Sequence, residues 1–408
     1  MKKLFTLVVA AFITLTVAQD TVTLRVWDTF SDAAQDEGMN ALIAAFEEAN
    51  PNIKIERDVQ AVDSMRPIIQ TSLASGTGPD VFYYDTGVGF AGVLADAGLL
   101  LPLDDAYATQ GWEHIYPWTK ERTNFGGKVY GVGNAVEFLG AYYNMDMFEE
   151  LGLTVPTTYE EFLAVCEALK AAGKVPVSFG DSDGWPAFHM FSIWTNNLAG
   201  KEKMDELLFN NGSWEDPIVV EAIQKFFVDM NTAGYLIPTP TAVNYDDSVT
   251  LFTSGQAGIM ITGTWLISTV VEQAAFEPGW FFVPNPNGSD PLPPAGLGSG
   301  YFVSANSEHP EESIAFLDFL FDPANANIWA EQMNIVPPYA VDMSSFEVPA
   351  LYSFAVEALA TVPMGYNIDV ITPEAFNTAM LDGFQAVLLG DKTPEQQAAD
   401  LQAAIDAQ

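Results

Sequence analysis

Apolar residues along the chain switch repeatedly between two spacings. Apolar and polar residues alternate over 22–27, and Ile53, Ile55 and Val59 resume this alternation over 53–59, which predicts two strands. Between them, apolar residues recur every three to four positions over 39–46, which predicts a helix. A second helix is expected over 64–76, followed by a short strand over 80–84. This alternation predicts an α/β sheet with helices on its faces.

The rest of the chain keeps this alternation and ends in helices. Thr158 and Glu161 form a capping box at the start of a predicted helix. Strands are predicted over 175–179 and 257–261. Glycines punctuate short strands over 126–140, which indicates a crossing between two domains. Two domains also suit the length of 408 residues, because a single hydrophobic core stops growing below that size.

The N-terminal segment has the features of a secretory signal peptide, expected over residues 1–18. Lys2 and Lys3 precede the apolar stretch Leu4–Val17, and small residues lead to a predicted cleavage site after Ala18. A buried N-terminal helix is the alternative for this segment. Export to the periplasm or to the outside of the cell is therefore expected. Cys166 is the only cysteine, so the sequence predicts no internal disulfide and no lipid anchor at the cleavage site.

Acidic residues dominate the charge of the chain. There are 54 acidic and 15 basic residues, and the net charge is -39 at pH 7. Such a charge disfavours nucleic acid and anionic lipid as partners. No later segment is apolar over a length that would insert into a membrane. Lys and Arg are absent between Lys225 and Lys392, so clamps for an anionic ligand are scarce and a neutral polyol or a cation is favoured.

Cofactor and metal motifs are weak. Gly87, Gly89 and Gly92 match the spacing of the dinucleotide fingerprint. However, the preceding strand is not the first of its sheet, and an exported protein would rarely meet a nicotinamide cofactor. The three histidines share no metal-binding spacing, and the acidic turn 181–184 is an incomplete calcium loop. We therefore expect no cofactor and no metal ion.

Several acidic and aromatic residues suit a sugar site. Asp80, Asp85 and Glu137 could hydrolyse a glycosidic bond or simply accept hydrogen bonds from sugar hydroxyls, and their spacing leaves both interpretations open. Nucleophilic catalysis is not indicated, because Gly-x-Ser-x-Gly is absent and Cys166 lies on the apolar face of a predicted helix. Aromatic rings can stack on the apolar faces of sugars. The aromatic candidates lie near Gly or Pro, although each also suits a core position: Trp185, Trp265, Tyr301, Tyr339 and Tyr366.

Five stretches of the sequence carry a family pattern when taken in order. Gly78-Pro-Asp-Val81 is followed by aromatic residues. In 130–152, Tyr-Gly-Val-Gly-Asn-Ala-Val-Glu precedes Tyr-Tyr-Asn-Met-Asp-Met-Phe. The stretch 255–265 reads Gly-Gln-Ala-Gly-Ile-Met-Ile-Thr-Gly-Thr-Trp, and 298–317 and 393–402 complete the series. Together they resemble the extracellular solute-binding proteins of ABC sugar importers, the class of the maltose-binding protein.

The resemblance implies a two-lobed α/β fold. Each lobe is expected to hold a mainly parallel sheet flanked by helices, and the chain is expected to cross between the lobes about three times. The N-terminal lobe is expected to comprise residues 19–130 and 280–330. The C-terminal lobe is expected to comprise residues 131–279 and 331–408.

The resemblance also implies roles for individual residues. Trp265 is expected to stack on a sugar, and Glu137 is expected to accept hydrogen bonds from sugar hydroxyls. Tyr84 follows the Gly-Pro-Asp segment in the first lobe, and Trp185 stands where the second lobe often supplies a ring. Tyr339 replaces a basic residue that relatives often carry, which suits a neutral ligand. The predicted ligand-binding residues are Tyr84, Asp85, Glu137, Trp185, Trp265, Tyr301, Tyr339 and Tyr366.

These expectations combine into one functional hypothesis. The exported chain binds a neutral carbohydrate between its lobes, closes on it and delivers it to the permease of an ABC transporter. It is expected to act as a monomer and not as an enzyme. Two alternatives stay open: a secreted glycoside hydrolase with two carboxyl groups at catalytic separation, and a binding protein for another solute, such as a polyamine.

Overall fold

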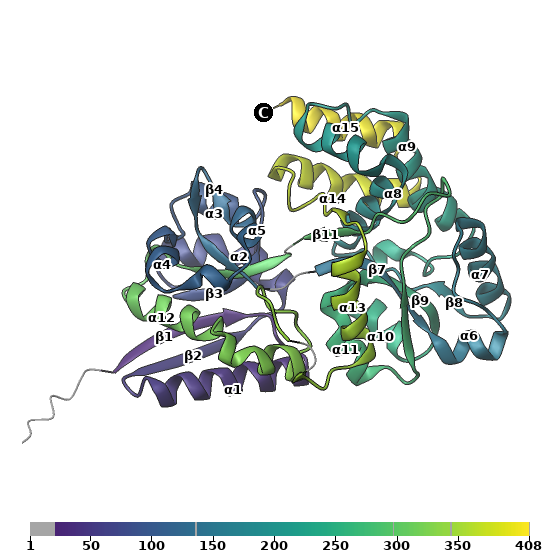
Figure 1. Ribbon diagram of the computed structural model, residues 1–408. Helices are drawn as coiled ribbons and strands as arrows, with labels where there is room; N and C mark the ends of the chain where they lie inside the picture. Colours follow the sequence, from purple (N-terminus) through teal and green to yellow (C-terminus); the bar gives the residue numbers. More distant parts are fainter. Residues whose placement is uncertain (1–20, 135–136, 297, 343–344, 408) are drawn as a thin grey trace, which may run out of the picture.

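The structure is a computed structural model that describes residues 21–134, 137–296, 298–342 and 345–407. Figure 1 shows two lobes side by side, each built on its own sheet, which confirms the predicted two-lobed α/β fold. The expected signal peptide, residues 1–18, lies outside the described residues. Within those ranges, no helix is long and apolar enough to cross a membrane.

The N-terminal lobe is built on a five-stranded sheet. Its strands are β1 (Val22–Asp28), β2 (Ile53–Val59), β3 (Val81–Asp85), β6 (Gly131–Gly133) and β12 (Ser299–Val303). They lie in the order β2-β1-β3-β12-β6. β1 is parallel to β2 and β3, whereas β12 is antiparallel to β3 and β6. The three strands predicted before residue 90 are thus confirmed to within one residue at each end.

The C-terminal lobe is built on a second sheet. Its strands are β7 (Glu137–Asn144), β8 (Val175–Val177), β9 (Ala257–Gly263), β10 (Pro278–Phe281), β11 (Pro294–Gly296) and β13 (Gly365–Tyr366). The order is β13-β11-β7-β9-β8, and β10 also pairs with β7. β7 is antiparallel to β9, β10 and β11. Each sheet is therefore mainly parallel, as expected, with one strand that runs against the others: β12 in the N-terminal sheet and β7 in the C-terminal sheet. Both of these strands directly follow a crossing between the lobes.

Helices cover both sheets (Figure 1). Those of the N-terminal lobe are α1 (Ala33–Ala49), α2 (Val62–Ser75), α3 (Ala91–Asp96), α4 (Asp104–Thr109), α5 (Pro117–Arg122) and α12 (Pro310–Leu320). Those of the C-terminal lobe are α6 (Met145–Leu151), α7 (Tyr159–Ala171), α8 (Pro186–Phe209), α9 (Pro217–Ile223), α10 (Tyr245–Thr253), α11 (Ile267–Gln273), α13 (Ala350–Thr361), α14 (Glu374–Leu389) and α15 (Pro394–Asp406). A short hairpin joins β4 (Asn124–Phe125) to β5 (Lys128–Val129).

Local signals in the sequence explain several helix ends. Thr158 and Glu161 form the predicted capping box at the start of α7. Asp216 caps α9 through a bond from the amide of Ile218. α2 ends at Gly76, which has φ of 72° and so adopts the left-handed conformation that glycine tolerates best.

The crossings between lobes fall at different places from those expected. β6 belongs to the N-terminal sheet, so the first crossing follows Gly133 and not residue 130. β10 and β11 pair within the C-terminal sheet, so the second crossing lies between Gly296 and Ser299 and not near 280. Tyr339 still packs in the N-terminal core, so the third crossing lies beyond it and not near 330. Pro and Gly mark turns inside a lobe as readily as crossings, which explains the misplaced limits.

Candidate functional site

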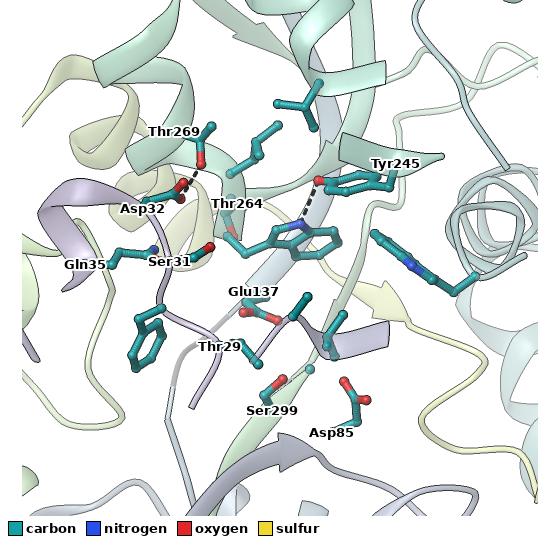
Figure 2. A pocket seen from close by; sticks show the side chains of 18 of the residues that line it. Thr29, Ser31, Asp32, Gln35, Asp85, Glu137, Tyr245, Thr264, Thr269 and Ser299 are labelled. Atoms are coloured by element: carbon teal, nitrogen blue, oxygen red, sulfur yellow. Dashed lines mark hydrogen bonds between the residues drawn. The ribbon is translucent and has the colours of Figure 1, made fainter. Parts of the chain in front are cut away.

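A cleft of about 440 Å³ lies between the two lobes. The N-terminal lobe lines it with the loop after β1, the start of α2 and the end of β3. The C-terminal lobe contributes residues of α8, α10 and the segment 264–269. Figure 2 shows side chains from both lobes around one space. Its volume lies within the range of sites for small molecules.

Four aromatic side chains of the C-terminal lobe form one wall of the cleft: Trp185, His189, Tyr245 and Trp265. Ring centroids lie 4.5 Å apart for Trp185 and Tyr245, and 5.0 Å apart for His189 and Trp265. Burial lowers the pKa of His189 to about 3, and nearby Arg66 adds to this effect. The imidazole is therefore neutral, and the wall offers apolar ring faces for stacking.

The position of the Trp265 indole depends on a glycine and a tyrosine. A Cβ atom on Gly263 would lie 1.8 Å from the indole ring, so the ring covers this residue closely. The indole Nε1 donates to the Tyr245 hydroxyl at 3.0 Å, as Figure 2 shows. That hydroxyl also lies 3.0 Å from Oγ1 of Thr262 on β9. In the Gly-x-Trp sequence, the missing side chain of Gly263 therefore leaves room for the indole ring of Trp265. The hydrogen bond to Tyr245 holds the indole N–H in one orientation.

Arg66 joins two acidic residues on the N-terminal side of the cleft. Its Nε donates to Oδ2 of Asp85 at 2.8 Å, and its Nη1 donates to Oδ1 of Asp63 at 3.3 Å. The guanidinium carbon also lies 5.4 Å from the centroid of the Phe90 ring. Asp63 reaches the other lobe as well, because its Oδ2 accepts from the Trp185 indole at 3.4 Å. One cation thus offsets part of the negative charge of the cleft.

Glu137 begins β7, directly after the first crossing, and lines the cleft. Burial raises the pKa of its carboxyl to about 8, nearby Asp85 adds to the rise, and a hydrogen bond with the Gly298 backbone opposes it. At neutral pH the carboxyl is therefore mostly protonated and can both donate and accept. Gly298 provides the space, because a Cβ atom there would lie 2.2 Å from Oε2 of Glu137.

Three buried oxygen atoms of cleft residues have no hydrogen-bond partner within the described part of the chain. They are the Oδ1 atoms of Asn334, Asn367 and Asp369. Burial raises the pKa of Asp369 to about 6, and the charge of Asp85 contributes to the rise. Buried polar atoms are normally paired, so these acceptors suit a ligand that brings hydroxyl donors.

The structure brings half of the predicted ligand-binding residues together. Strand alternation explains why Asp85 lines the cleft and its neighbour Tyr84 does not. Tyr83 and Asp85 lie on the face of β3 that lines the cleft, whereas Tyr84 between them points to the other face and packs in the core. The predicted residues that line the cleft are Asp85, Glu137, Trp185 and Trp265.

The four predicted tyrosines lie outside the cleft lining. Tyr84 is 7% exposed and Tyr301 is fully buried, each within a core of the N-terminal lobe. Tyr339 is 2% exposed in the same lobe and pairs through its backbone with Ile115. Tyr366 is half-buried on β13, and its hydroxyl donates to Asp205. Proximity to Gly or Pro does not indicate which face of a strand a ring occupies.

Sequence reasoning missed several residues of the cleft. His189 lies four residues after Trp185 on α8, so helical spacing would have placed both rings on one face. Tyr245 follows the helix cap Asn244, where polar and aromatic residues meet at a helix start. Residues 29–35, which form the loop before α1 and the start of that helix, carry no motif of their own, and neither does the segment 367–370.

Packing accounts for the glycines of the dinucleotide fingerprint. Gly87 has φ of +92°, and a Cβ atom there would lie 2.2 Å from the backbone oxygen of Val370. A Cβ atom on Gly89 would lie 2.7 Å from Nδ2 of Asn377. These glycines therefore let the 370–377 segment approach the loop after β3 closely.

The described residues offer little for metal binding or nucleophilic catalysis. They contain no group of three His, Cys, Asp or Glu residues that could hold a metal ion. Cys166 is buried in the C-terminal core, and burial raises the pKa of its thiol to about 12. A thiol with such a pKa is not a ready nucleophile.

Known proteins of similar sequence and structure fit this architecture. An uncharacterized ABC transporter extracellular-binding protein of Pyrococcus horikoshii is 27% identical over 315 residues, which cover 76% of this chain and 70% of the relative. The multiple sugar-binding protein of Streptococcus mutans is 24% identical over 74% of this chain and 71% of the relative. A chitin oligosaccharide binding protein of solved structure superposes with a TM-score of 0.84 at 24% identity, over 95% of this chain and 99% of that protein.

The family pattern found in the sequence is confirmed by a match that spans most of the chain. The model of the bacterial extracellular solute-binding protein family matches residues 31–327, which include most strands of both sheets and most of the cleft residues. Sequence, fold and cleft agree, and the chain belongs to the family of bacterial extracellular solute-binding proteins.

Proposed function

We propose that this protein binds a neutral carbohydrate in the cleft between its lobes and delivers it to the permease of an ABC transporter. The observation that carries the proposal is the pairing of an aromatic wall with unpaired acceptors in one cleft. Ring faces suit the apolar C–H faces of a sugar, and the acceptors suit its hydroxyl groups. The sugar-binding relative from Streptococcus mutans and the chitin oligosaccharide binding protein support the same ligand class.

A cationic solute such as a polyamine is the second candidate. The cleft holds six acidic side chains against the single guanidinium of Arg66: Asp32, Asp63, Asp85, Glu137, Asp246 and Asp369. Like-charge neighbours contribute to the raised pKa of Asp246, which a bound ammonium group would relieve. Protonation of Glu137 and the ion pairs of Arg66 reduce this surplus, so a neutral ligand is favoured.

A thermal-shift screen followed by calorimetry tests the two candidates directly. The panel contains maltotriose, raffinose, xylotriose and chitotriose, with putrescine and spermidine as the cationic arm. Ligands that bind only the native state raise the melting temperature by mass action. Trp265→Ala should weaken binding of the best sugar about 10- to 100-fold, whereas Phe209→Ala, which removes an exposed ring outside the cleft, should not. Shifts with the polyamines alone would replace the sugar proposal by the second candidate.

We further propose that the protein acts without hydrolysis, as a monomer, after export and cleavage at Ala18. Membership of a family of binding proteins supports the first point, and the sequence of residues 1–18 supports export. Chromatography of each oligosaccharide after prolonged incubation checks for turnover. N-terminal sequencing of the exported protein should begin at Gln19, and light scattering should report the mass of one chain.

A further inference from the structure

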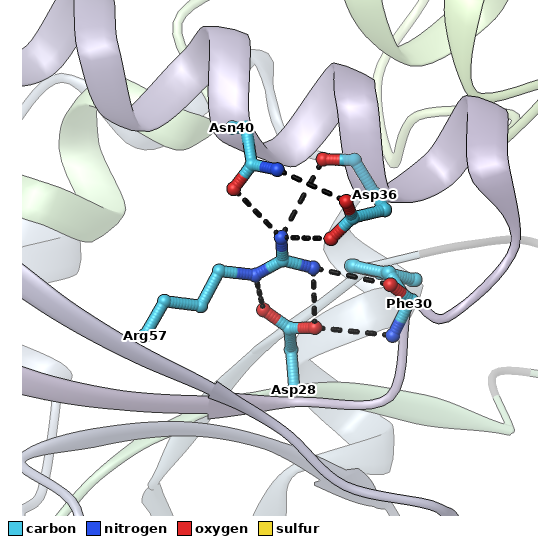
Figure 3. Close-up of polar contacts among 5 residues, drawn as sticks. All are labelled: Asp28, Phe30, Asp36, Asn40 and Arg57. Atoms are coloured by element: carbon cyan, nitrogen blue, oxygen red, sulfur yellow. Dashed lines mark hydrogen bonds and ion pairs between the residues drawn. The ribbon is translucent and has the colours of Figure 1, made fainter.

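Arg57 on β2 lies at the centre of a polar cluster behind the cleft (Figure 3). Its side chain is only 8% exposed and that of Asp28 is fully buried. Nε donates to Oδ2 of Asp28 at 2.6 Å, and Nη2 donates to Oδ1 of Asp28 at 2.9 Å. Nη1 donates to Oδ1 of Asn40 at 2.9 Å and to Oδ1 of Asp36, both on α1. One guanidinium therefore ties the end of β1 to the first turns of α1.

The same cluster holds the backbone of the loop that joins β1 to α1. Nη2 of Arg57 also donates to the carbonyl oxygen of Phe30 at 3.1 Å, and the Phe30 amide donates to Oδ1 of Asp28 at 3.0 Å. The Phe30 ring packs in the N-terminal core, 4.9 Å from the ring of Tyr83. Both polar groups of the Phe30 backbone are thus fixed by the cluster, and its side chain is fixed by the core.

The residues that line the cleft in this segment are different from the polar residues that hold its backbone in place. The residues of this segment that line the cleft are Thr29, Phe30, Ser31, Asp32 and Gln35. The polar groups that hold the segment from behind do not line it: Asp28, Asp36, Asn40 and Arg57. Figure 2 shows Thr29, Ser31, Asp32 and Gln35 along one side of the cleft.

Stability alone is a poor explanation for the buried pair. Removing two charges from water costs desolvation energy that their attraction often only balances, so a buried ion pair is weak evidence for net stabilisation. What the planar guanidinium supplies is geometry, because its donors lie in one fixed fork. Lysine would keep the charge without the fork. The contacts of Arg57 to two elements and one loop carbonyl use this property fully.

We propose that Arg57 is a positioning residue for ligand binding: it holds the loop of residues 29–32 in the geometry in which Ser31 and Asp32 face the bound solute. The inference rests on the proposed function, since it gives a task to a residue that no ligand in the cleft would touch. Arg57 acts through the loop, so its loss changes affinity without removing any side chain from the cleft lining.

The first test needs no ligand. Hydrogen exchange of the amides in residues 29–36 should accelerate about tenfold or more in Arg57→Lys, because the loop gains access to open states. Lys54→Met is the matched control, since Lys54 and Glu47 also join β2 to α1 by an ion pair of 2.7 Å, but Lys54 is 52% exposed. Unchanged exchange in Arg57→Lys, or equal acceleration in Lys54→Met, overturns the proposal. Should Arg57→Lys not fold, Asn40→Ala removes one of the contacts of Arg57 and should accelerate the same amides about threefold.

The second test asks whether Arg57 acts through the loop. With the sugar of the panel that binds best, Arg57→Lys should raise Kd about tenfold. In a Ser31→Ala/Asp32→Ala background, which lacks the two loop side chains proposed to face the solute, it should raise Kd less than about twofold. A tenfold effect in both backgrounds contradicts positioning through the loop. Failure of every sugar to bind would overturn the proposed function instead. The exchange experiment, which needs no ligand, would still test whether Arg57 holds the loop in place.

Discussion

The backbone amide of Ala34, at the N-terminus of α1, donates to Oε1 of Glu272 on α11 at 3.0 Å. A carboxylate of the C-terminal lobe therefore caps a helix of the N-terminal lobe. Asp32, the N-cap residue of α1, makes no side-chain bond to its own helix, because its Oδ2 accepts from the hydroxyl of Thr269 on α11. Two contacts at the cleft thus join the lobes, and each satisfies a group at the start of α1.

Glu272→Ala should shift the protein without ligand towards a more open form. Glu272 does not line the cleft, so the substitution removes a contact between lobes without removing a lining side chain. An exposed, charge-assisted bond of this kind contributes about 1 kcal/mol, which predicts a roughly fivefold rise in Kd. X-ray scattering should show a larger radius of gyration, and calorimetry should show the weaker binding. Glu202→Ala, an exposed acid on α8 outside the cleft, is the control. Equal radii and affinities in both variants would exclude a contribution of this contact to closure.

Tyr245→Phe should weaken sugar binding while leaving the fold intact. The variant removes the acceptor of the Trp265 indole and the contact with Thr262, so the indole loses the bond that orients it. A neutral hydrogen bond contributes about 1 kcal/mol, so Kd should rise roughly fivefold. Tyr143→Phe, on β7 outside the cleft lining, should bind normally. An affinity of Tyr245→Phe equal to that of the unmodified protein would show that the ring needs no polar restraint.

The carboxyl of Glu137 should make the stability of the protein depend on pH. Its pKa is about 8 in the folded protein and 4.5 as the ordinary value, so between these pH values the folded chain binds a proton that the unfolded chain lacks. Stability should therefore fall as pH rises from about 5 to 8, by at most about 1.4 kcal/mol per pH unit from this group. Asp369, with a pKa of about 6, adds a fall of the same sign at lower pH.

Glu137→Gln should flatten this dependence, because the amide does not titrate. Denaturant unfolding at pH 5.5, 6.5 and 7.5 measures the slope for both proteins. Glu357→Gln, which replaces an exposed acid on α13, is the control and should retain the slope of the unmodified protein. If Glu137→Gln keeps the full slope, other groups are responsible and the carboxyl is ionised across this range.

Much of the fold was predictable because it follows from local chemistry. Alternating apolar residues gave the strands β1 and β2, and Thr158 with Glu161 gave the start of α7. Trp265 was predictable within the site for a similar reason. The indole ring of Trp265 lies so close to Gly263 that no larger residue fits at position 263. The three residues of the Gly-x-Trp motif therefore determine the position of the ring by themselves.

The rest of the site depends on distant contacts that no short pattern records. Ser31 and Thr269 meet at one cleft because three crossings bring their lobes together, and neither residue stands in a recognisable motif. Arg57 acts on the cleft from behind, through the backbone of Phe30. The predicted tyrosines show the opposite error, in which core residues are assigned to the site. The sequence around Tyr301 is compatible both with a sugar site and with the N-terminal core in which the ring lies.

Tyr301→Phe separates these two roles for a tyrosine. The Tyr301 hydroxyl is buried and has no hydrogen-bond partner within the described residues, so its removal should leave stability unchanged or raise it by up to about 1–2 kcal/mol. Tyr107→Phe is the matched comparison in the same core, because the Tyr107 hydroxyl donates to the Gly131 oxygen at 3.2 Å. That variant should lose about 1 kcal/mol, since it removes one buried hydrogen bond while Oγ1 of Thr123 still donates to the same oxygen at 2.9 Å. Denaturant unfolding measures both variants, and calorimetry should find normal sugar affinity in each. A fivefold loss of affinity in Tyr301→Phe alone would show that Tyr301 contributes to ligand binding. A loss of stability in Tyr301→Phe would show that its hydroxyl has a hydrogen-bond partner.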